Sequence, residues 1–275
     1  MPEMPEVETV RRTLTPLVTG RTIEKMVLWY PKIVVGDAEE TARRLAGKKI
    51  LKLDRYGKYL EFRLSGNLTL VSHLRMEGKY RLTTPEAPKD KHDHIEFIFT
   101  DGTALRYNDV RKFGRMHLVE TGTERELTGI RHLGPEPNTP EFSTDYFYQA
   151  LQKKQKNIKT ALLDQNIVCG LGNIYVDEVL WFAQIQPESR AKDIPKDKVK
   201  VLHDWINTLI ARATHMRGTT VHTFLDADGK VGGYQKMLHV YGRAGEPCDR
   251  CSTPLVKIKL QGRGTVYCPH CQTSY

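Results

Sequence analysis

The stretch CDRCSTPLVKIKLQGRGTVYCPHC, residues 248–271, contains four of the five cysteines of the chain. Its two pairs follow the spacing C-x2-C-x16-C-x2-C, which is typical of a zinc site with four thiolate ligands. Each pair places two thiolates on one tight turn, and two such turns complete a tetrahedron with no open position for catalysis. A redox-active dithiol is the alternative, but the βαβ pattern of such sites is missing. The spacing therefore predicts one structural Zn²⁺ held by Cys248, Cys251, Cys268 and Cys271.

Between the two cysteine pairs, residues 255–267 form two alternating segments around the sequence QGRG. This pattern predicts a zinc-ribbon hairpin with Arg263 at its tip. An arginine on a rigid tip can bind a phosphate group through two hydrogen bonds, although a solvated turn arginine is the alternative. The fifth cysteine, Cys169, is isolated in IVCGLGN and is expected to be a small buried side chain rather than a nucleophile.

Upstream of the ribbon, residues 1–133 read as one helix followed by many short strands. Apolar and polar residues alternate within these segments, and Gly, Asn and Asp occupy the turns between them. Such a run of short strands predicts a β-sandwich. The alternating segments are 48–66, 67–83, 93–102 and 103–120.

The composition changes after residue 133. Three prolines, Pro135, Pro137 and Pro140, predict a linker over residues 134–144. Residues 145–239 have helical periodicity as far as Gly218, and a glycine-rich loop is expected over 218–235. The zinc ribbon occupies 240–275. The sequence thus predicts an α+β protein of two domains: a helix with a β-sandwich, then a helical domain with a zinc ribbon.

Charge narrows the class of partner. The chain has 275 residues, with 42 Lys and Arg against 33 Asp and Glu, which leaves a formal net charge of +9. A basic excess of this size favours a polyanion, with nucleic acid ahead of an acidic membrane. The chain contains no run of eighteen apolar residues, which is about the length needed to span a bilayer. Its acidic N-terminal segment lacks the basic and apolar regions of a signal peptide. A cytoplasmic protein is therefore expected.

The chain begins MPEMPEVETV, residues 1–10. Proline suits the first turn of a helix, where its missing N–H is no loss, and the glutamates, Glu8 among them, complement the helix dipole and cap the helix. Apolar residues then recur at helical spacing, which predicts a buried helix face. They are Val7, Val10, Leu14 and Val18.

Six segments in this order resemble the formamidopyrimidine-DNA glycosylase family from end to end. They are PEMPEVE at 2–8, RYGKYL at 55–60, SHLRMEG at 72–78, DVRKFG at 109–114, LLDQNIVCGLGNIYVDEVLW at 162–181, and GRGT at 262–265. Each segment alone is weak evidence for the family, whereas all six in the same order are specific to it. The resemblance implies a helix–two-turn–helix element in the helical domain, with tight turns at Gly170 and Gly172.

The resemblance also implies a catalytic role for the N-terminus. Met1 is removed in this family, so that Pro2 becomes a free secondary amine that attacks C1′ of a damaged nucleotide and forms a Schiff base. Glu3 is then the general acid, and Glu6 either orients the amine or lies on the first helical turn. Lys58 and Arg263 contact the phosphates and assist strand elimination. From the residues alone, an exposed strand lysine is the alternative for Lys58.

Further positions match DNA contacts of the family. Residues expected to contact the DNA backbone are His73, His92, Arg111, Lys154 and Asn173. Met76, Arg111 and Phe113 are expected to fill the gap that an extruded base leaves in the stack. Core packing is the alternative for Met76 and Phe113.

The expected function is that of a bifunctional DNA glycosylase and apurinic/apyrimidinic lyase in base excision repair. It would remove oxidised purines such as 8-oxoguanine and formamidopyrimidines from double-stranded DNA, followed by β,δ-elimination. A glycosylase of the endonuclease VIII type, acting on oxidised pyrimidines, and a non-enzymatic zinc-ribbon nucleic-acid-binding protein remain alternatives. A monomer associated with the nucleoid, without a membrane partner, is expected.

Two residues depart from the family pattern. Arg217 precedes Gly218 where relatives carry two glycines, and Ser252 follows the first cysteine pair where relatives usually carry glycine. The first change affects the expected lesion loop, and the second affects the geometry of the zinc site.

Overall fold

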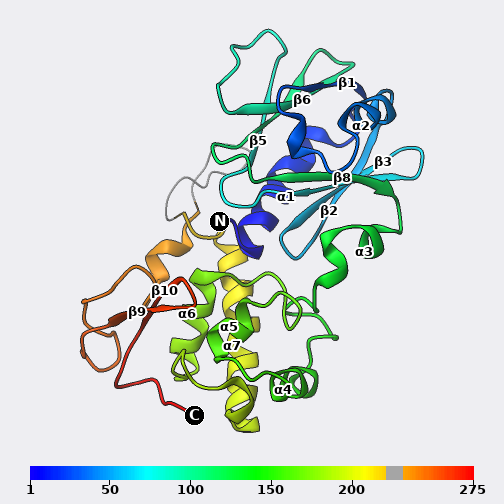
Figure 1. Cartoon of the computed structure of the whole chain (residues 1–275). Coiled ribbons are helices and arrows are strands. Elements are labelled where there is room, and N and C mark those ends of the chain that lie inside the picture. Colours follow the sequence, from blue (N-terminus) through cyan, green and yellow to red (C-terminus); the bar gives the residue numbers. More distant parts are fainter. Residues whose placement is uncertain (221–231) are drawn as a thin grey trace. The chain divides into compact units, whose positions relative to one another are not determined.

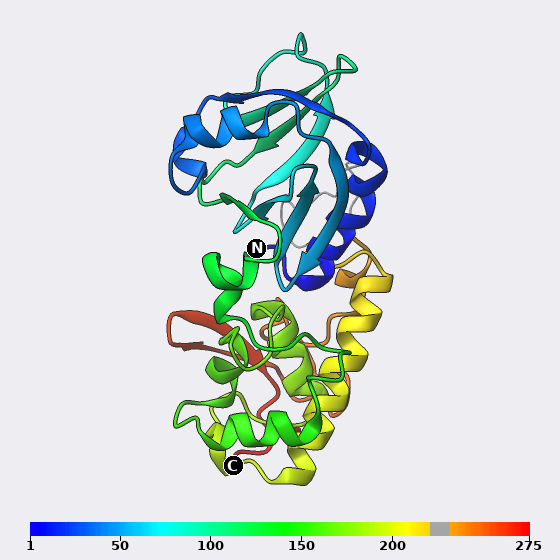
Figure 2. The same ribbon diagram turned by 90° about the vertical axis from the view of Figure 1, so that its right-hand side faces the viewer.

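The computed structural model describes residues 1–220 and 232–275. The chain divides into two compact units, Met1–Arg131 with Arg217–Gly233, and His132–Met216 with Tyr234–Tyr275 (Figures 1 and 2). The domain limits expected from composition, at residues 133, 144 and 239, stay predictions.

The first unit contains two four-stranded antiparallel sheets. One has the order β1-β6-β7-β5, with β1 at Ile23–Leu28, β6 at Asp93–Phe99, β7 at Ala104–Asn108 and β5 at Lys79–Thr83. The other has the order β2-β3-β4-β8, with β2 at Ile50–Tyr56, β3 at Tyr59–Leu64, β4 at Leu68–His73 and β8 at Arg115–Glu120. The predicted β-sandwich is confirmed, and strands β2 to β8 fall within the four alternating segments.

Helices of the first unit cover parts of both sheets. Helix α1, Met4–Val18, packs on β2 and β3, and α2, Ala38–Leu45, packs on β1 (Figure 1). The short elements are η1 at Pro31–Ile33, α3 at Glu124–Leu127 and η2 at Gly129–His132. The apolar stripe of α1 is buried as predicted, with Leu14 and Val18 fully inaccessible. Burial of each such side chain contributes roughly 1.5–3 kcal/mol to the hydrophobic stabilisation of the core.

Helix α1 begins later than the proline pattern predicts. Glu3 is its N-cap, and Pro5 lies in its first turn. A capping box closes this end: the Glu3 side chain accepts the backbone N–H of Glu6, while the Glu6 carboxylate accepts the backbone N–H of Glu3 at 2.7 Å. The helix-start interpretation of Pro2 is therefore wrong, because Pro2 precedes the helix and Pro5 takes that role.

The second unit is helical, with a two-stranded ribbon. Helix α6, Asn173–Phe182, packs against α5, Ile158–Leu163, and α7, Lys196–His215, and α7 also packs on α4, Thr144–Gln152 (Figure 2). The remaining elements are η3 at Ala191–Asp193, η4 at Tyr234–Met237, β9 at Val256–Leu260 and β10 at Arg263–Tyr267. The predicted helical domain with a zinc ribbon is confirmed.

Both departures from the family pattern lie at left-handed backbone positions. Arg217 has φ 65° and Ser252 has φ 59°, the region in which glycine carries no penalty. A non-glycine residue there costs about 1–2 kcal/mol. The turn after the first cysteine pair is nevertheless closed by a hydrogen bond from Ser252 N to Cys248 O at 2.8 Å. At both positions the backbone therefore keeps the left-handed conformation that glycine favours, although neither residue is glycine.

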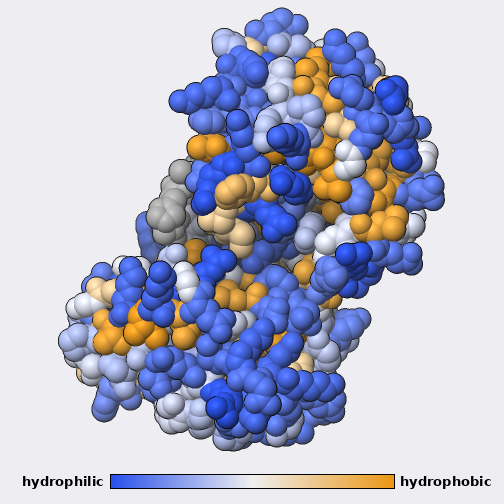
Figure 3. Space-filling model, in the orientation of Figure 1, coloured by the Kyte–Doolittle hydropathy of each residue, from blue (hydrophilic) through white to orange (hydrophobic). Residues whose placement is uncertain are grey.

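The surface is largely polar on the face shown in Figure 3. The hydrophobic residues of this face form separate patches. Of the helices in the described ranges, none combines the length and the apolar character needed to cross a membrane.

Candidate active site, DNA-contact residues and zinc centre

The four ribbon cysteines converge on one point. Their sulfur atoms all lie within 4.8 Å of one another, and Cys251 Sγ lies 3.5 Å from Cys268 Sγ. A Zn–S bond of about 2.3 Å in a tetrahedron implies S···S distances of about 3.8 Å. The indole N–H of Trp181 also donates to Cys248 Sγ at 3.4 Å. The four cysteines are positioned for one structural zinc, as predicted, and Cys169 is buried in the core as expected.

A buried ion pair joins the ribbon to the helices of the second unit. Lys159 Nζ on α5 lies 2.6 Å from Asp177 Oδ1 on α6 and donates to the carbonyl oxygen of Gly264 at 3.0 Å. Asp177 Oδ2 accepts the backbone N–H of Val266 at 3.1 Å. Lys159 and Asp177 were missed from the sequence, because no local pattern distinguishes them from surface charges.

The ribbon segment held by this ion pair lies beside two of the residues expected to contact DNA, Asn173 and Arg263. Asn173, the first residue of α6, donates from Nδ2 to the Gly264 carbonyl at 3.0 Å. Arg263 is adjacent to Gly264 in the chain, begins β10 after the turn at Gln261 and Gly262, and is exposed. Within the described ranges, 1–220 and 232–275, the buried Oδ1 of Asn173 has no hydrogen-bond partner. Lys154 Nζ lies 3.4 Å from Asn166 Oδ1 on the turn that precedes α6.

In the first unit, the acidic N-terminus is buried. Pro2 is buried, and Glu3 and Glu6 are each 2 % exposed. Glu6 holds two segments at once, because Oε2 accepts the N–H of Glu3 and Oε1 accepts the N–H of Thr219 at 2.6 Å. Gly218 packs so closely on Glu6 that a Cβ atom would overlap its carboxylate. Glu6 thus fixes the backbone next to Pro2 against residues 218–219.

The expected lesion loop is described only at its ends. The N–H of Gly232 donates to Thr220 Oγ1 at 2.8 Å, so the two ends meet near Glu6. Residues 221–231 of the predicted loop 218–235 lie outside the described residues.

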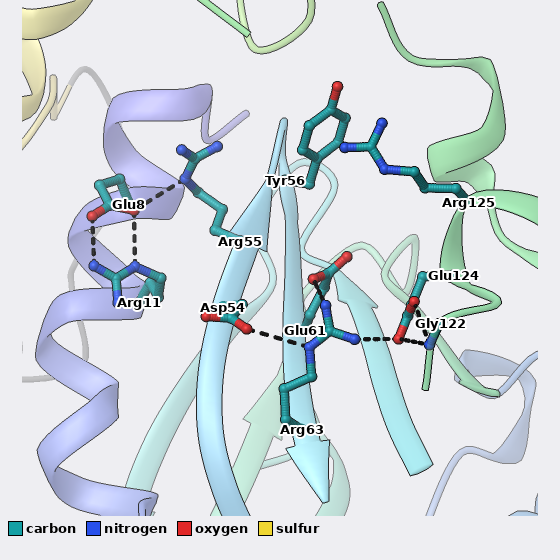
Figure 4. Close-up of a pocket in the computed structure, with 10 residues that line it drawn as sticks. All are labelled: Glu8, Arg11, Asp54, Arg55, Tyr56, Glu61, Arg63, Gly122, Glu124 and Arg125. Atoms are coloured by element: carbon teal, nitrogen blue, oxygen red, sulfur yellow. Dashed lines mark hydrogen bonds and ion pairs between the residues drawn. The ribbon is translucent and has the colours of Figure 1, made fainter. Parts of the chain in front are cut away.

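Lys58 lies in the tight turn between β2 and β3 and is only 5 % exposed, so the alternative of an exposed strand lysine is wrong. Two residues upstream of this turn, Arg55 donates to the carbonyl oxygen of Gly57 at 2.9 Å and to Glu8 Oε2 at 3.0 Å. Figure 4 shows Arg55 reaching from β2 toward Glu8 on α1. Arg55 therefore ties the turn that carries Lys58 to the helix that follows Glu3.

Glu8 does not cap the helix, contrary to the expectation from the sequence. It accepts hydrogen bonds from Arg11, Arg12 and Arg55 at 2.8–3.0 Å, at one side of a cavity of about 490 Å³ (Figure 4). Burial raises the pKa of Glu8, but the hydrogen bonds and charges of Arg11 and Arg55 outweigh burial and lower its pKa to about 2.

This low pKa predicts a pH-dependent stability. The stabilisation from Glu8 is present above the unfolded-state pKa near 4.5 and is lost as pH falls toward 2. At pH 6 we expect Glu8→Gln to lower the free energy of unfolding by about 3 kcal/mol. The difference between wild type and variant, measured by urea unfolding at a series of pH values, should shrink below pH 5. A difference that is constant with pH would contradict this assignment.

His73 is a neutral side chain rather than a cation. Burial, followed by the charges of Arg75 and Lys58, lowers the pKa of His73 to about 3. Its Nδ1 accepts the backbone N–H of Arg75 at 2.9 Å, which assigns the ring proton to Nε2. His73 can therefore donate one hydrogen bond to a phosphate but cannot supply positive charge.

The three residues expected to enter the DNA stack lie on two turns of the first unit. Met76 is half-buried, and Phe113 is 47 % exposed, so core packing is wrong for Phe113. The exposed Arg111 guanidinium lies over the Phe113 ring, 4.7 Å from its centroid. His92 is half-buried, and its backbone N–H donates to Asp90 Oδ1 at 2.8 Å.

Three family models match successive parts of the chain. The formamidopyrimidine-DNA glycosylase N-terminal domain matches residues 1–116, the H2TH domain of the same glycosylases matches 133–225, and a zinc finger found in FPG and IleRS matches 245–273. With the sandwich, the helical unit and the four-thiol ribbon, they define a zinc-containing DNA glycosylase. The formamidopyrimidine-DNA glycosylase of Lactobacillus gasseri is 70 % identical over 275 residues, all of both chains. The chain belongs to the formamidopyrimidine-DNA glycosylase family.

Solved structures agree with this assignment. A point mutant of the Lactococcus lactis enzyme, bound to DNA containing Fapy-dG, superposes with a TM-score of 0.94 at 43 % identity over 99 % of this chain and 100 % of that chain. The wild-type Lactococcus lactis enzyme bound to DNA with an oxidised pyrimidine gives a TM-score of 0.92, with the same identity and coverage.

Proposed function

We propose that this chain removes oxidised purines from double-stranded DNA and then cuts the strand, with Pro2 as the nucleophile. The observation that carries the proposal is the burial of Pro2, Glu3 and Glu6 at the start of the chain, with Glu6 bonded to both Glu3 and Thr219. The capping box accounts for the bonds between Glu3 and Glu6, but burying two carboxylates to 2 % exposure is costly, which supports a role beyond the helix start.

Removal of Met1 is required, because the Pro2 nitrogen is otherwise part of a peptide bond without a basic lone pair. Met1 is 44 % exposed, so it is accessible to processing. An α-amino group ordinarily has a pKa of about 7.7–8.0, which leaves a reactive neutral fraction near pH 7.

The proposed reaction begins when the Pro2 nitrogen bonds to C1′ of the damaged nucleotide and the bond from C1′ to the base breaks. Glu3 supplies a proton to the sugar oxygen or to the departing base, and the opened sugar becomes a cationic Schiff base. Loss of a proton from C2′ expels the 3′ phosphate, and a second elimination expels the 5′ phosphate. Lys58 and Arg263 hold these phosphates as the C–O bonds break.

The remaining contacts position the duplex. Backbone phosphates would be bound by Arg111, Lys154 and Asn173 together with His92 and the Nε2 proton of His73. The working form is proposed to be a monomer in the cytoplasm, acting on the nucleoid, because one chain carries the complete set of these residues.

Release of different bases tests the function. Duplexes with a formamidopyrimidine or 8-oxoguanine should lose the base faster than duplexes with an oxidised pyrimidine, and the strand should end in phosphates on both sides of the gap. An undamaged duplex is the control. Faster release of the oxidised pyrimidine would favour the endonuclease VIII type. This comparison is needed because the similar Lactococcus lactis enzyme has been solved with DNA that contains an oxidised pyrimidine. Tight duplex binding without any release would favour the non-enzymatic binder.

A further inference from the structure

Two turns of the first unit share an unusual backbone feature. The turn at 74–78 carries Met76, and the turn at 109–114 carries Arg111 and Phe113. Each contains a non-glycine residue in the left-handed region, Arg75 with φ 55° and Lys112 with φ 58°. Such conformations persist when the surrounding structure holds them in place.

Tyr107, near the end of β7, lies between the two turns. Its side chain is fully buried, and its hydroxyl packs against Gly78 in one turn and Gly114 in the other. A Cβ atom at either glycine would overlap this hydroxyl. Neither glycine has a positive φ, so close packing is what requires them: Tyr107 alone at Gly114, and Tyr107 together with the carbonyl oxygen of Leu74 at Gly78.

Asp109 organises the second turn from within. Its Oδ1 accepts the N–H of Arg111 at 3.0 Å, and its Oδ2 accepts the N–H of Gly114 at 2.8 Å. The Tyr107 hydroxyl donates to the same Oδ2 at 3.4 Å. Asp109 is fully buried, so neither it nor Tyr107 can reach DNA.

The backbone of Asp109 adds a link to another expected DNA contact. Its N–H donates to the carbonyl oxygen of His92 at 3.0 Å, and its own carbonyl accepts from His94 Nε2 at 2.8 Å. The side chains of Tyr107 and Asp109 thus contact or bond the two turns that carry Met76, Arg111 and Phe113, and the backbone of Asp109 bonds the segment that carries His92.

We propose that Tyr107 and Asp109 are positioning residues that hold the two turns in register, so that Met76, Arg111 and Phe113 enter the DNA stack as one unit. This inference rests on the proposed function, because it assigns these three side chains to the gap left by an extruded base. Removing the Tyr107 hydroxyl releases the contact with both glycines. Removing one acceptor from Asp109 leaves a turn N–H without its partner.

The chain offers a matched control in Tyr80. This residue lies on the neighbouring strand β5, is buried, and has its ring 5.2 Å from that of Tyr107. Its hydroxyl bonds Ser72 Oγ at 2.7 Å and does not belong to either turn. Tyr80→Phe therefore removes a buried hydroxyl from the same core while leaving the turns intact.

The experiment compares Tyr107→Phe, Asp109→Asn and Tyr80→Phe with wild type on two substrates. One is a duplex with an oxidised purine, in which the stack must be filled. The other is a single strand with an abasic site, which has neither a partner base nor a stack to fill. A 2-aminopurine placed beside a stable abasic analogue in a duplex reports insertion directly, without turnover.

We expect Tyr107→Phe to slow excision from the duplex by about three- to tenfold and Asp109→Asn by about ten- to a hundredfold. Both should reduce the 2-aminopurine signal while cutting the single strand within about twofold of wild type. Tyr80→Phe should match wild type in every assay.

The inference is overturned if Tyr107→Phe and Tyr80→Phe behave alike, or if Tyr107→Phe loses duplex and single-strand activity in equal measure. A wild-type protein that cuts neither substrate would instead refute the proposed function. The 2-aminopurine signal would still decide whether the two turns insert into DNA under the control of Tyr107.

Discussion

A chain that begins with an added residue before Pro2 should lose borohydride-trapped DNA adducts completely, and Pro2→Gly should lose most of them. In the extended chain the attacking nitrogen becomes an amide, which is not a nucleophile. Glycine keeps an amine but lacks the ring that fixes its direction. We expect excision by the extended chain to fall on the order of a thousandfold or more, as when other enzymes lose a nucleophile. Single-turnover excision and reductive trapping with the same duplex measure both effects.

Pro5 provides the matched control, because it lies three residues further on in the first turn of α1. Pro5→Ala changes the helix start but leaves the terminal amine intact, so trapping should persist. Peptide mapping of the reduced adduct should locate the DNA on residue 2. Unchanged trapping by the extended chain would mean that an internal lysine is the nucleophile, and the proposed mechanism would then be wrong.

The second large effect is expected at the zinc centre. Cys251→Ser removes one of four thiolates that lie within 4.8 Å of one another, and a structural zinc contributes about 10 kcal/mol or more to folding of its module. Without the ion, β9 and β10 lose the site that closes the ribbon, and Arg263, the first residue of β10, is no longer held in a rigid hairpin. We expect the bound zinc to fall from one per chain to none and duplex affinity to fall at least about a hundredfold.

Zinc content by elemental analysis and duplex affinity by fluorescence anisotropy would check this expectation. Cys169→Ala is the control, since Cys169 is buried in the core and does not belong to the four-thiol cluster. It should keep one zinc per chain and bind duplex as wild type does. A zinc-free Cys251→Ser protein with unchanged affinity would show that the ribbon needs no metal to contact DNA.

Much of the fold was predictable because its patterns are local. The hairpins of the sandwich follow from period-two alternation between turn residues, and the buried face of α1 follows from helical spacing. Among the elements that were missed are β1 and α2. The strand β1 has Glu24 and Lys25 in succession, which interrupts the alternation, and α2 is only eight residues long with Thr41 and Leu45 buried. Neither has a pattern long enough to stand out from the background.

The sequence by itself determined the zinc ligands and the apolar face of α1, because each depends on neighbours close along the chain, and its resemblance to the family supplied the candidates for the reacting groups. Only the tertiary structure decided that Glu8 bonds Arg55, 47 residues away, and that Lys159 reaches Gly264, 105 residues away. It alone placed the Tyr107 hydroxyl between Gly78 and Gly114. Such contacts arise from sheet register and the packing of helices on sheets and ribbon, and no local spacing of residue types encodes them.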